Sequence, residues 1–428
     1  MQAGHNQRRI GAEVLADMLA GYGVTHVFMV PAVLRRTFAE MERRTKIARV
    51  HCHGEKSAAY MADGYARASG KPGICMAQVI GALNLAAGLR DAYLAHSPVI
   101  AMTGGRDPKT KFRKVYQEID DMPAFEPVTK MNVTIDDVAR IPDMVRQAFR
   151  TATTGAPGPV HLQFRGNEGQ VDLEEAEMEA LVEAQFARVP PFRPEPEAAH
   201  VKAALELLQK AERPIIVAGG GARASGAGRE LVALAEALQI PIATSLNGKD
   251  IIPGIHPLSV GVVGSYSREC ANRTVNRADL VCFIGTETGG MTTHFWAVPK
   301  IGTPALQIDI EPQSLGRNYP LVASVLGDAR SVLVRMLGQI DKSSAAKRAP
   351  WIKELSDLRA DWYTRYKPML ESDAVPIHPA RICGELTKHA DWRLRCGDHV
   401  FNQPDLLPPR RNRQEPDDRP RQILLVHA

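Results

Sequence analysis

Short apolar strands alternate with helical segments along most of this chain, and this alternation limits the possible folds more than any other feature. Apolar stretches near residues 27–30, 47–51, 74–79 and 98–102 are separated by helical patterns that include 55–68 and 83–94. A similar alternation returns between 198 and 336. Strands separated by helices at this spacing form parallel sheets covered on both faces. We therefore predict an α/β protein with two doubly wound parallel-sheet domains in tandem.

A proline-rich stretch separates the two alternating parts. Residues 190–196 contain four prolines and cannot continue a helix or a central strand. We predict a first domain over 1–168, a linker over 169–197 and a second α/β domain over 198–338. A helical linker over 339–377 follows. Residues 378–428 contain the beginning of a third domain and an Arg- and Pro-rich tail, whose composition is typical of disorder. The abrupt loss of pattern near residue 390 indicates a shifted reading frame or a premature end.

Charge and hydropathy argue against nucleic-acid and membrane binding. Lysine and arginine number 53 against 48 acids, and the basic residues are scattered among the acids. No stretch approaches the roughly 18 consecutive apolar residues of a membrane span. Residues 10–19 have the pattern of an amphipathic helix rather than a signal peptide. The six cysteines are isolated, which is typical of reduced thiols. We expect a cytoplasmic protein that binds neither nucleic acid nor membrane.

Glu55 lies where a predicted strand passes into a predicted helix. It is followed by small and apolar residues in the run Lys56-Ser57-Ala58-Ala59-Tyr60-Met61-Ala62-Asp63-Gly64-Tyr65-Ala66-Arg67. By position alone, its carboxylate need only complement the positive end of the helix. His51 and His53 are two apart on one strand without a nearby group of carboxylates, so no metal site is predicted there.

The segment around Glu55 resembles the glutamate-bearing segment of thiamine diphosphate (ThDP) enzymes of the acetolactate synthase group. Further matches follow in the same order and spacing over about residues 8–165. They are Gly70-Lys71-Pro72-Gly73, Gly81, Asn84, Asp91-Ala92-Tyr93, His96-Ser97-Pro98-Val99-Ile100, Gln117-Glu118-Ile119-Asp120 and Gly155-Ala156-Pro157-Gly158-Pro159-Val160-His161-Leu162. This region therefore resembles the pyrimidine-binding domain of that family.

The resemblance implies a specific role for Glu55. In the family, this glutamate hydrogen-bonds N1′ of the ThDP aminopyrimidine and favours its imino tautomer, which removes the thiazolium C2 proton. The resulting ylid attacks a 2-oxo acid, and loss of CO₂ leaves an enamine, with the cofactor as electron sink. An apolar pocket that raises a carboxyl pKa would suit this role. The resemblance places ThDP against Val30, Pro31, Glu55, Gly81, Asn84 and Gln117.

Residues 198–335 resemble the central domain of the same family. Acetolactate synthases hold FAD in this domain, whereas several relatives hold ADP or nothing. The resemblance places FAD or ADP near Gly219, Gly220, Gly221, Gly285, Asp309 and Asp328. A glycine-rich turn alone is usually only a turn. Glu287 also follows Gly285 in a segment without the arginine that acetolactate synthases typically carry there, which counts against FAD.

Three departures limit what the resemblance implies. The loop Met29-Val30-Pro31-Ala32 lacks glycines that the family usually has, and the loop 78–84 lacks a proline and a glycine; both loops face cofactor and substrate in relatives. The family's diphosphate and Mg²⁺ site, G-D-G followed by N, lies in a third domain. Gly327-Asp328-Ala329 and Gly397-Asp398-His399 do not match it. No metal ligand is predicted, so the Mg²⁺ site is expected to be absent from this chain.

The sequence thus predicts a ThDP-dependent 2-oxo acid decarboxylase or carboligase of the acetolactate synthase type. It would act on pyruvate-like substrates, with little activity expected from this chain alone. Two alternatives stay open. The chain could be half of a split enzyme completed by a partner, or a non-catalytic binding or regulatory subunit paired with a full-length homologue. The resemblance also implies a homo-oligomer, a dimer or tetramer, because relatives build the active site between subunits.

Overall fold

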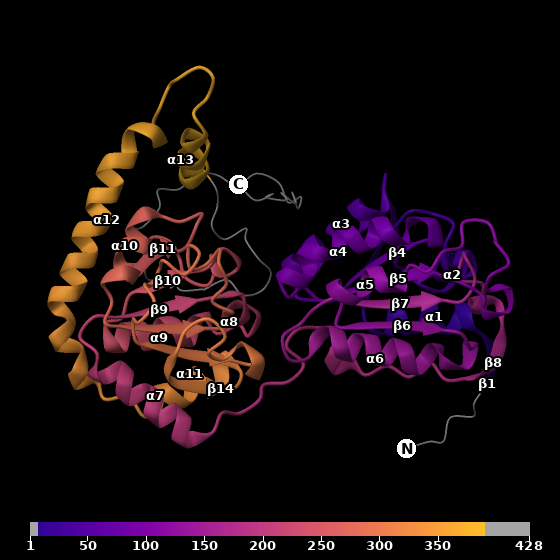
Figure 1. Cartoon of the computed structure of the whole chain (residues 1–428), viewed down its shortest axis with the longest axis horizontal. Coiled ribbons are helices and arrows are strands. Elements are labelled where there is room, and N and C mark those ends of the chain that lie inside the picture. Colours follow the sequence, from indigo (N-terminus) through magenta and orange to yellow (C-terminus); the bar gives the residue numbers. More distant parts are fainter. Residues whose placement is uncertain (1–6, 390–428) are drawn as a thin grey trace, which may run out of the picture.

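The computed structural model describes residues 7–389, which form two α/β units followed by helices (Figure 1). The first unit has a six-stranded sheet in the order β3-β2-β4-β5-β7-β6, and its neighbouring strands are parallel. Its strands are β2 (His26–Met29), β3 (Ala48–His51), β4 (Gly73–Ala77), β5 (Val99–Gly104), β6 (Met131–Ile135) and β7 (Val160–Phe164). Its helices are α1 (Gly11–Gly21), α2 (Arg35–Arg44), α3 (Glu55–Ser69), α4 (Ala82–Leu94), α5 (Met122–Phe125) and α6 (Ile141–Thr153).

Helices cover both faces of this sheet because its central strands are apolar on both sides. Met29, Met76 and Met102 pack into one buried cluster with residues of α1 and α6. The intervening residues Phe28 and Cys75 pack into a second cluster with alanines of α3 and leucines of α4. Successive strand residues point to opposite faces, so a continuous apolar run requires cover on both.

The second unit repeats this plan. Its six strands are parallel and lie in the order β11-β10-β9-β12-β13-β14. They are β9 (Pro214–Ala218), β10 (Ile242–Thr244), β11 (Ser259–Val262), β12 (Leu280–Ile284), β13 (Ala305–Asp309) and β14 (Leu321–Leu326). The helices are α7 (Ala198–Lys210), α8 (Gly220–Ala224), α9 (Gly228–Leu238), α10 (Glu269–Arg277) and α11 (Ala329–Leu337). Two parallel-sheet units in tandem confirm the predicted fold class.

The segment predicted as a linker also contributes to the first unit. Within it, β8 (Glu175–Met178) pairs antiparallel with β1 (Gln7–Ile10). Phe186, farther along, is buried in the core that contains α1 and α6. Asp172 is buried as well, and its carboxylate accepts hydrogen bonds from the backbone N–H and the hydroxyl of Thr37 in α2. The first unit therefore includes chain well beyond residue 168.

A long helix follows the second unit, in the region predicted as a helical linker. In α12 (Ala349–Leu370), Trp351 is buried and donates from Nε1 to the carbonyl of Pro214. Just before it, the fully buried Arg348 donates to carbonyls at the ends of α7 and α9, including Leu208 and Leu238. These contacts fasten α12 to the second sheet. Then α13 (Pro379–His389) packs beside it. The predicted disordered tail, with Gly397-Asp398-His399, lies outside the described residues.

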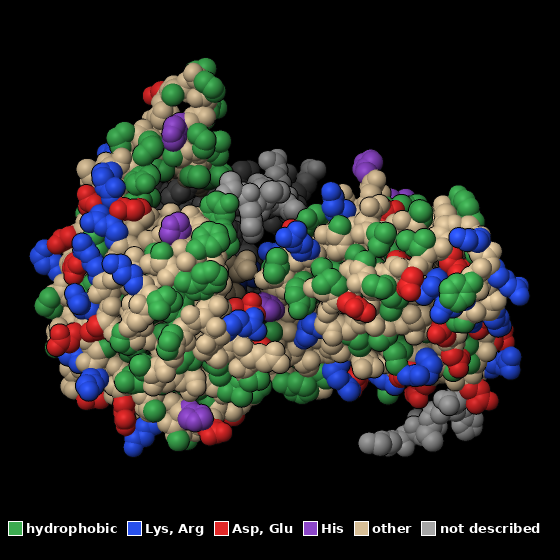
Figure 2. Space-filling view, in the orientation of Figure 1, with side chains coloured by type: hydrophobic (Ala, Val, Ile, Leu, Met, Phe, Trp, Pro, Cys, Tyr) green, Lys and Arg blue, Asp and Glu red, His purple; other side chains and the backbone are tan. Residues whose placement is uncertain are grey.

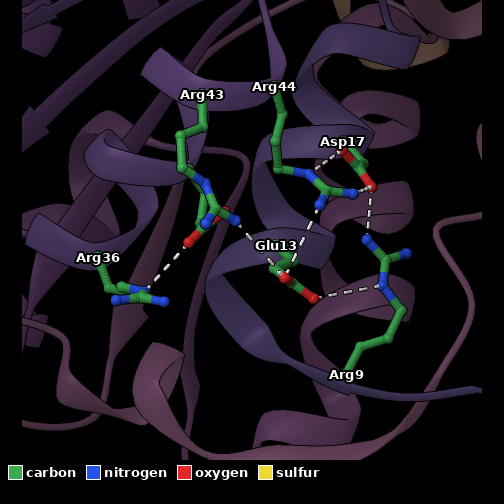
Figure 3. A network of polar contacts seen from close by, with 7 residues as sticks. Arg9, Glu13, Asp17, Arg36, Arg43 and Arg44 are labelled. Carbon is green, nitrogen blue, oxygen red and sulfur yellow. Dashed lines mark hydrogen bonds and ion pairs between the residues drawn. The ribbon is translucent and has the colours of Figure 1, made fainter.

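An ion-pair network joins α1 to α2 (Figure 3). Asp17 of α1 accepts from Arg9 and from Arg44, at 2.5 Å and 2.7 Å. Glu13 lies within 4.0 Å of Arg9, Arg43 and Arg44. Burial alone would raise the pKa of Asp17, but the hydrogen bonds from Arg44 and Arg9 bring it below its usual value. The network thus stabilises the charged form of Asp17.

Charges of both signs are interspersed across the face shown in Figure 2, with apolar side chains between them. Among the helices within residues 7–389, none combines the length and the apolar character needed to cross a bilayer.

Candidate functional site

The first candidate site lies at the carboxyl edge of the first sheet. β2 lies between β3 and β4 in the sheet. The chain therefore runs from β2 to β3 on one side and then crosses over to β4 on the other side. Loops after such strands diverge and leave a crevice, which is where open α/β sheets bind ligands. Val30 and Pro31 follow β2, and Gly81 follows β4. Glu55 begins α3, just after β3.

Glu55 and Asn84 are in direct contact at this edge. Asn84 Nδ2, in α4, donates to Glu55 Oε2 over 3.2 Å. Oε1 of the same carboxylate has no hydrogen-bond partner among the described side chains. Glu55 is half-buried and Asn84 is exposed. The structure therefore brings these two predicted residues together, with one carboxylate oxygen held and the other available.

Gly81 makes room for this carboxylate. A Cβ placed on Gly81 would lie 2.4 Å from Glu55 Oε1 and 2.5 Å from its Cγ and Cδ. Real non-bonded carbon atoms stay about 3.5–4.0 Å apart. Gly81 has an ordinary φ of −92°, so a side chain is excluded by space rather than by backbone conformation. Glu55 can lie in its observed position only because residue 81 has no side chain.

The other predicted ThDP residues lie in loops that follow strands of the same sheet. Gln117 accepts at Oε1 from Gln78 Nε2 over 3.3 Å, which links it to the loop that carries Gly81. Val30 and Pro31 lie at the end of β2. Ala32, next in this loop, has a φ of 83°, a left-handed conformation that costs an L-residue energy. Alanine therefore occupies a backbone conformation that suits the glycine usual in the family.

A pocket of about 550 Å³ opens beside β2 and β3 at the same edge. Its lining residues are apolar (Met29, Pro31, Ala32 and Phe38) or basic (Arg35, Arg49 and His51). Arg35 pairs with Glu168 and Arg49 with Glu42, so both guanidinium groups already have acidic partners. The two arginines were not predicted, because nothing local in α2, which carries Arg35, or in β3, which carries Arg49, indicates a pocket. Within residues 7–389, no three His, Cys, Asp or Glu side chains gather to hold a metal ion.

The second candidate site, for FAD or ADP, lies at the carboxyl edge of the second sheet. Gly219, Gly220 and Gly221 follow β9, and Gly285 follows the neighbouring β12. A Cβ on Gly219 would lie 2.2 Å from the carbonyl oxygen of Gly285, and one on Gly221 would lie 2.9 Å from Gly285 Cα. These glycines are thus required for the packing of the two loops against each other. Their small size is explained without a ligand.

The acids of this edge also have other partners. Asp328 accepts from Ser331 N, which caps α11, and from Arg193 of the linker at 2.9 Å. Asp309 is buried, and burial together with the charge of Glu287 raises its pKa to about 6. Glu287, which stands near the position of the family's arginine, is also acidic. The acidic groups Asp309 and Glu287 therefore disfavour the diphosphate of a dinucleotide at this edge.

Comparison with known proteins agrees with the resemblance. Residues 9–124 match the family described as "Thiamine pyrophosphate enzyme, N-terminal TPP binding domain". Residues 201–336 match "Thiamine pyrophosphate enzyme, central domain". The matched segments correspond to most of the two sheets described above.

Several curated relatives are similar to this chain. A "Probable acetolactate synthase large subunit" of Methanocaldococcus jannaschii is 34% identical over 88% of this chain and 63% of its own length. An "Acetolactate synthase" of Arthrospira platensis is 32% identical over 92% of this chain and 68% of its own length. The "Acetolactate synthase isozyme 3 large subunit" of Escherichia coli is 28% identical over 91% of this chain and 67% of its own length. The chain thus spans about two thirds of the length of these relatives, and slightly less for the first.

The fold, the position of Glu55 at the strand switch point and these matches agree, and the chain belongs to the thiamine pyrophosphate enzyme family, with acetolactate synthases among its relatives.

Proposed function

We propose that this chain forms part of a ThDP-dependent enzyme that decarboxylates a 2-oxo acid, and joins the product to a second carbonyl compound, as acetolactate synthases do. The observation that supports this most directly is the Glu55 carboxylate, held by Asn84 through one oxygen and lying over Gly81 at the switch point of the first sheet. Pyruvate-like acids are the proposed substrates, in keeping with the names of the relatives.

The residues at this edge suit the aminopyrimidine of ThDP. When bound, ThDP supplies a carbon nucleophile and an electron sink for the decarboxylation. Glu55 would share a proton with the ring nitrogen through the oxygen that Asn84 leaves free. Asn84 would fix the carboxylate's orientation, and a pre-oriented acid or base contributes about 10²–10⁴-fold to a rate. Val30, Pro31 and Gln117 would border the ring.

The diphosphate and Mg²⁺ would be held by residues other than those described. Residues 7–389 contain no group of three metal-ligating side chains, so none of them is assigned to Mg²⁺. We propose that these ligands come from a further domain, on a longer form of this polypeptide or on a partner chain. We propose that the second unit holds no flavin. Its loop glycines pack against each other, and Asp328 already accepts a hydrogen bond from Arg193.

Apolar side chains on α3 and α4 support an oligomer or a heteromer. The two helices pack against each other and leave several large apolar residues exposed: Tyr60, Met61, Leu83, Tyr93 and Leu94. Exposed apolar surface of this kind is typically covered by a partner. Two relatives are also named large subunits. We propose that this face binds a second copy or a full-length homologue.

Complementation tests this function. The chain is mixed with a full-length acetolactate synthase whose own equivalent of Glu55 is changed to glutamine, and pyruvate consumption is measured with ThDP and Mg²⁺. We expect turnover in the mixture, and its loss by at least about 10²-fold with Glu55→Gln in this chain. Glu206→Gln, which removes an exposed acid of α7 in the second unit, is the matched control and should leave turnover unchanged.

Each outcome of the mixing experiment has a distinct meaning. Turnover that survives Glu55→Gln would refute the assigned role of Glu55. Stable association without turnover would favour the alternative, a non-catalytic binding or regulatory subunit. Turnover by the chain alone would show that the diphosphate ligands do not require a partner.

A further inference from the structure

A histidine of the first unit contacts a glutamate of the second. His96 lies in the short turn between α4 and β5, with a left-handed φ of 55°. Its Nε2 is 3.5 Å from Oε1 of Glu287, which follows β12 at the carboxyl edge of the second sheet. The two residues are 191 positions apart, so this is a contact between units that folding alone brings together.

The surroundings of His96 favour the protonated ring. The backbone carbonyl of Pro157, in the loop before β7, also raises the pKa of the ring. A carboxylate and a carbonyl are both acceptors, so both favour the imidazolium, which carries an N–H on each ring nitrogen. The charged groups facing it are Glu287 and Asp309. Arg317 lies 3.7 Å from Glu287 and balances part of the acidic charge.

This contact lies at the carboxyl edge of the second sheet. Glu287 is two residues after Gly285, and Asp309 ends the neighbouring strand β13. At the same edge, Gly219 and Gly221 pack closely on Gly285. A second polar contact between units lies nearby in the chain, where Arg223 of α8 donates to the carbonyl of Arg67. The edge is therefore built as a contact surface between units.

We propose that His96 and Glu287 form a protonation-dependent contact that holds the first unit against the carboxyl edge of the second sheet. The two units would be held together when the ring is charged and would separate more readily when it is neutral. This proposal does not depend on the chemistry proposed at Glu55.

The sign of the pH dependence follows from the two partners. The hydrogen bond to Glu287 raises the pKa of His96 above its usual 6.5, although burial opposes this. The same bond lowers the pKa of Glu287. The contact is thus fully formed below the unfolded pKa of histidine and is lost as pH rises through the raised value. At the acid end it is lost only when Glu287 is protonated. Asp309, whose own pKa burial raises to about 6, also favours the charged ring once it is ionised.

Histidine NMR and proteolysis test the proposal on the whole chain. The His96 ring is titrated between pH 5 and 9 in the wild-type protein and in Glu287→Gln. We expect a pKa above 6.5 in the wild type and a return toward 6.5 in the variant. At a fixed pH of 6.5, cleavage within residues 188–196 should be about two- to five-fold faster in Glu287→Gln and in His96→Gln, as expected for the loss of a half-exposed ion pair.

A matched control exists in the second unit. Glu236→Gln removes a carboxylate that lies 3.1 Å from His256 Nε2, and both residues belong to that unit. This variant should not change cleavage between the units. His96→Lys, which keeps a permanent charge, should remove the pH dependence and keep the units together at high pH.

Two results would overturn the proposal. One is a His96 pKa that is the same in the wild type and in Glu287→Gln, together with wild-type cleavage in both variants. The other is a ratio of cleavage rates, Glu287→Gln over wild type, that stays the same from pH 6.5 to pH 9, because the contact would then not depend on the charge of the ring.

Discussion

Replacing Gly81 by alanine should separate folding from function in this protein. The added Cβ would lie 2.4 Å from Glu55 Oε1 and within 2.5 Å of Cγ and Cδ. Contacts at that distance are not tolerated, so one group must move by about 1 Å to reach an ordinary separation. The group that can move is the end of the Glu55 side chain, because all three close atoms belong to it.

The stability change should be small because its terms nearly cancel. Moving Glu55 loses its hydrogen bond from Asn84, worth about 1 kcal/mol. Alanine at a compatible φ restricts the unfolded chain and returns about 0.4–1 kcal/mol. We expect a net change within about 1 kcal/mol. Function is more sensitive, since a displacement of about 1 Å at a reacting group can reduce a rate about 10²-fold.

Gly88→Ala is the matched control, in the middle of α4. Its Cβ would lie 2.7 Å from Ala59 Cβ and 2.8 Å from the carbonyl oxygen of Lys56 in α3. A backbone carbonyl cannot turn aside, so this substitution should destabilise the protein by about 1–3 kcal/mol. Both variants are compared by urea unfolding and by turnover in the complemented mixture described above.

The two substitutions should therefore affect different properties, turnover in one case and stability in the other. Gly81→Ala is expected to unfold like the wild type and to lose turnover. Gly88→Ala is expected to unfold at lower urea. If Gly81→Ala were as unstable as Gly88→Ala, the end of the Glu55 side chain would not be moving away from the new Cβ. If it kept full turnover, the position of Glu55 would not matter for catalysis.

Two further predictions concern stability. Asp17→Asn should lower the free energy of unfolding by about 0.5–1 kcal/mol at pH 7, after allowance for its partial exposure. Because the folded pKa of Asp17 is lowered, its contribution is present above the unfolded pKa of about 3.9 and disappears below it. Urea unfolding at pH 7 and near pH 3.5 checks this, and an equal difference at both would contradict it. Ala32→Gly should stabilise the protein by up to about 1 kcal/mol, because a φ of 83° costs alanine about 1–2 kcal/mol and glycine gives back part of that in entropy. Ala20→Gly, in a helical position of α1, should destabilise the protein by about 1 kcal/mol. If both variants were less stable than the wild type, the backbone of Ala32 would not be strained.

Apolar periodicity predicted the central strands, because each is buried on both faces. The edges were harder to predict. β6, at one edge of the first sheet, is only partly buried along most of its length, and β14 has exposed positions. α2 buries Phe38 and Met41 among six arginines and glutamates, and its Glu40 is buried only because Arg36 and Arg43 pair with it. Such partly polar elements have no clear signal in one sequence.

The Glu55 site was also predictable only in part. The resemblance predicted that Glu55, Gly81 and Asn84 belong together, and the structure places them in contact. It could not predict why residue 81 must be glycine, which depends on a distance between two loops. The contact of His96 with Glu287 was also out of reach, since nothing local in either segment indicates its partner.

The pairing of β1 with β8 decides how this protein can be divided for experiments. The strand at residues 7–10 lies against the strand at 175–178, so a fragment that stops at residue 168 would leave the first strand with an open edge. Unpaired edges recruit other chains and promote aggregation. Phe186 lies farther along and is buried in the same core. A piece intended to fold alone should therefore run from residue 7 through at least residue 187, where both ends of the first unit are secured.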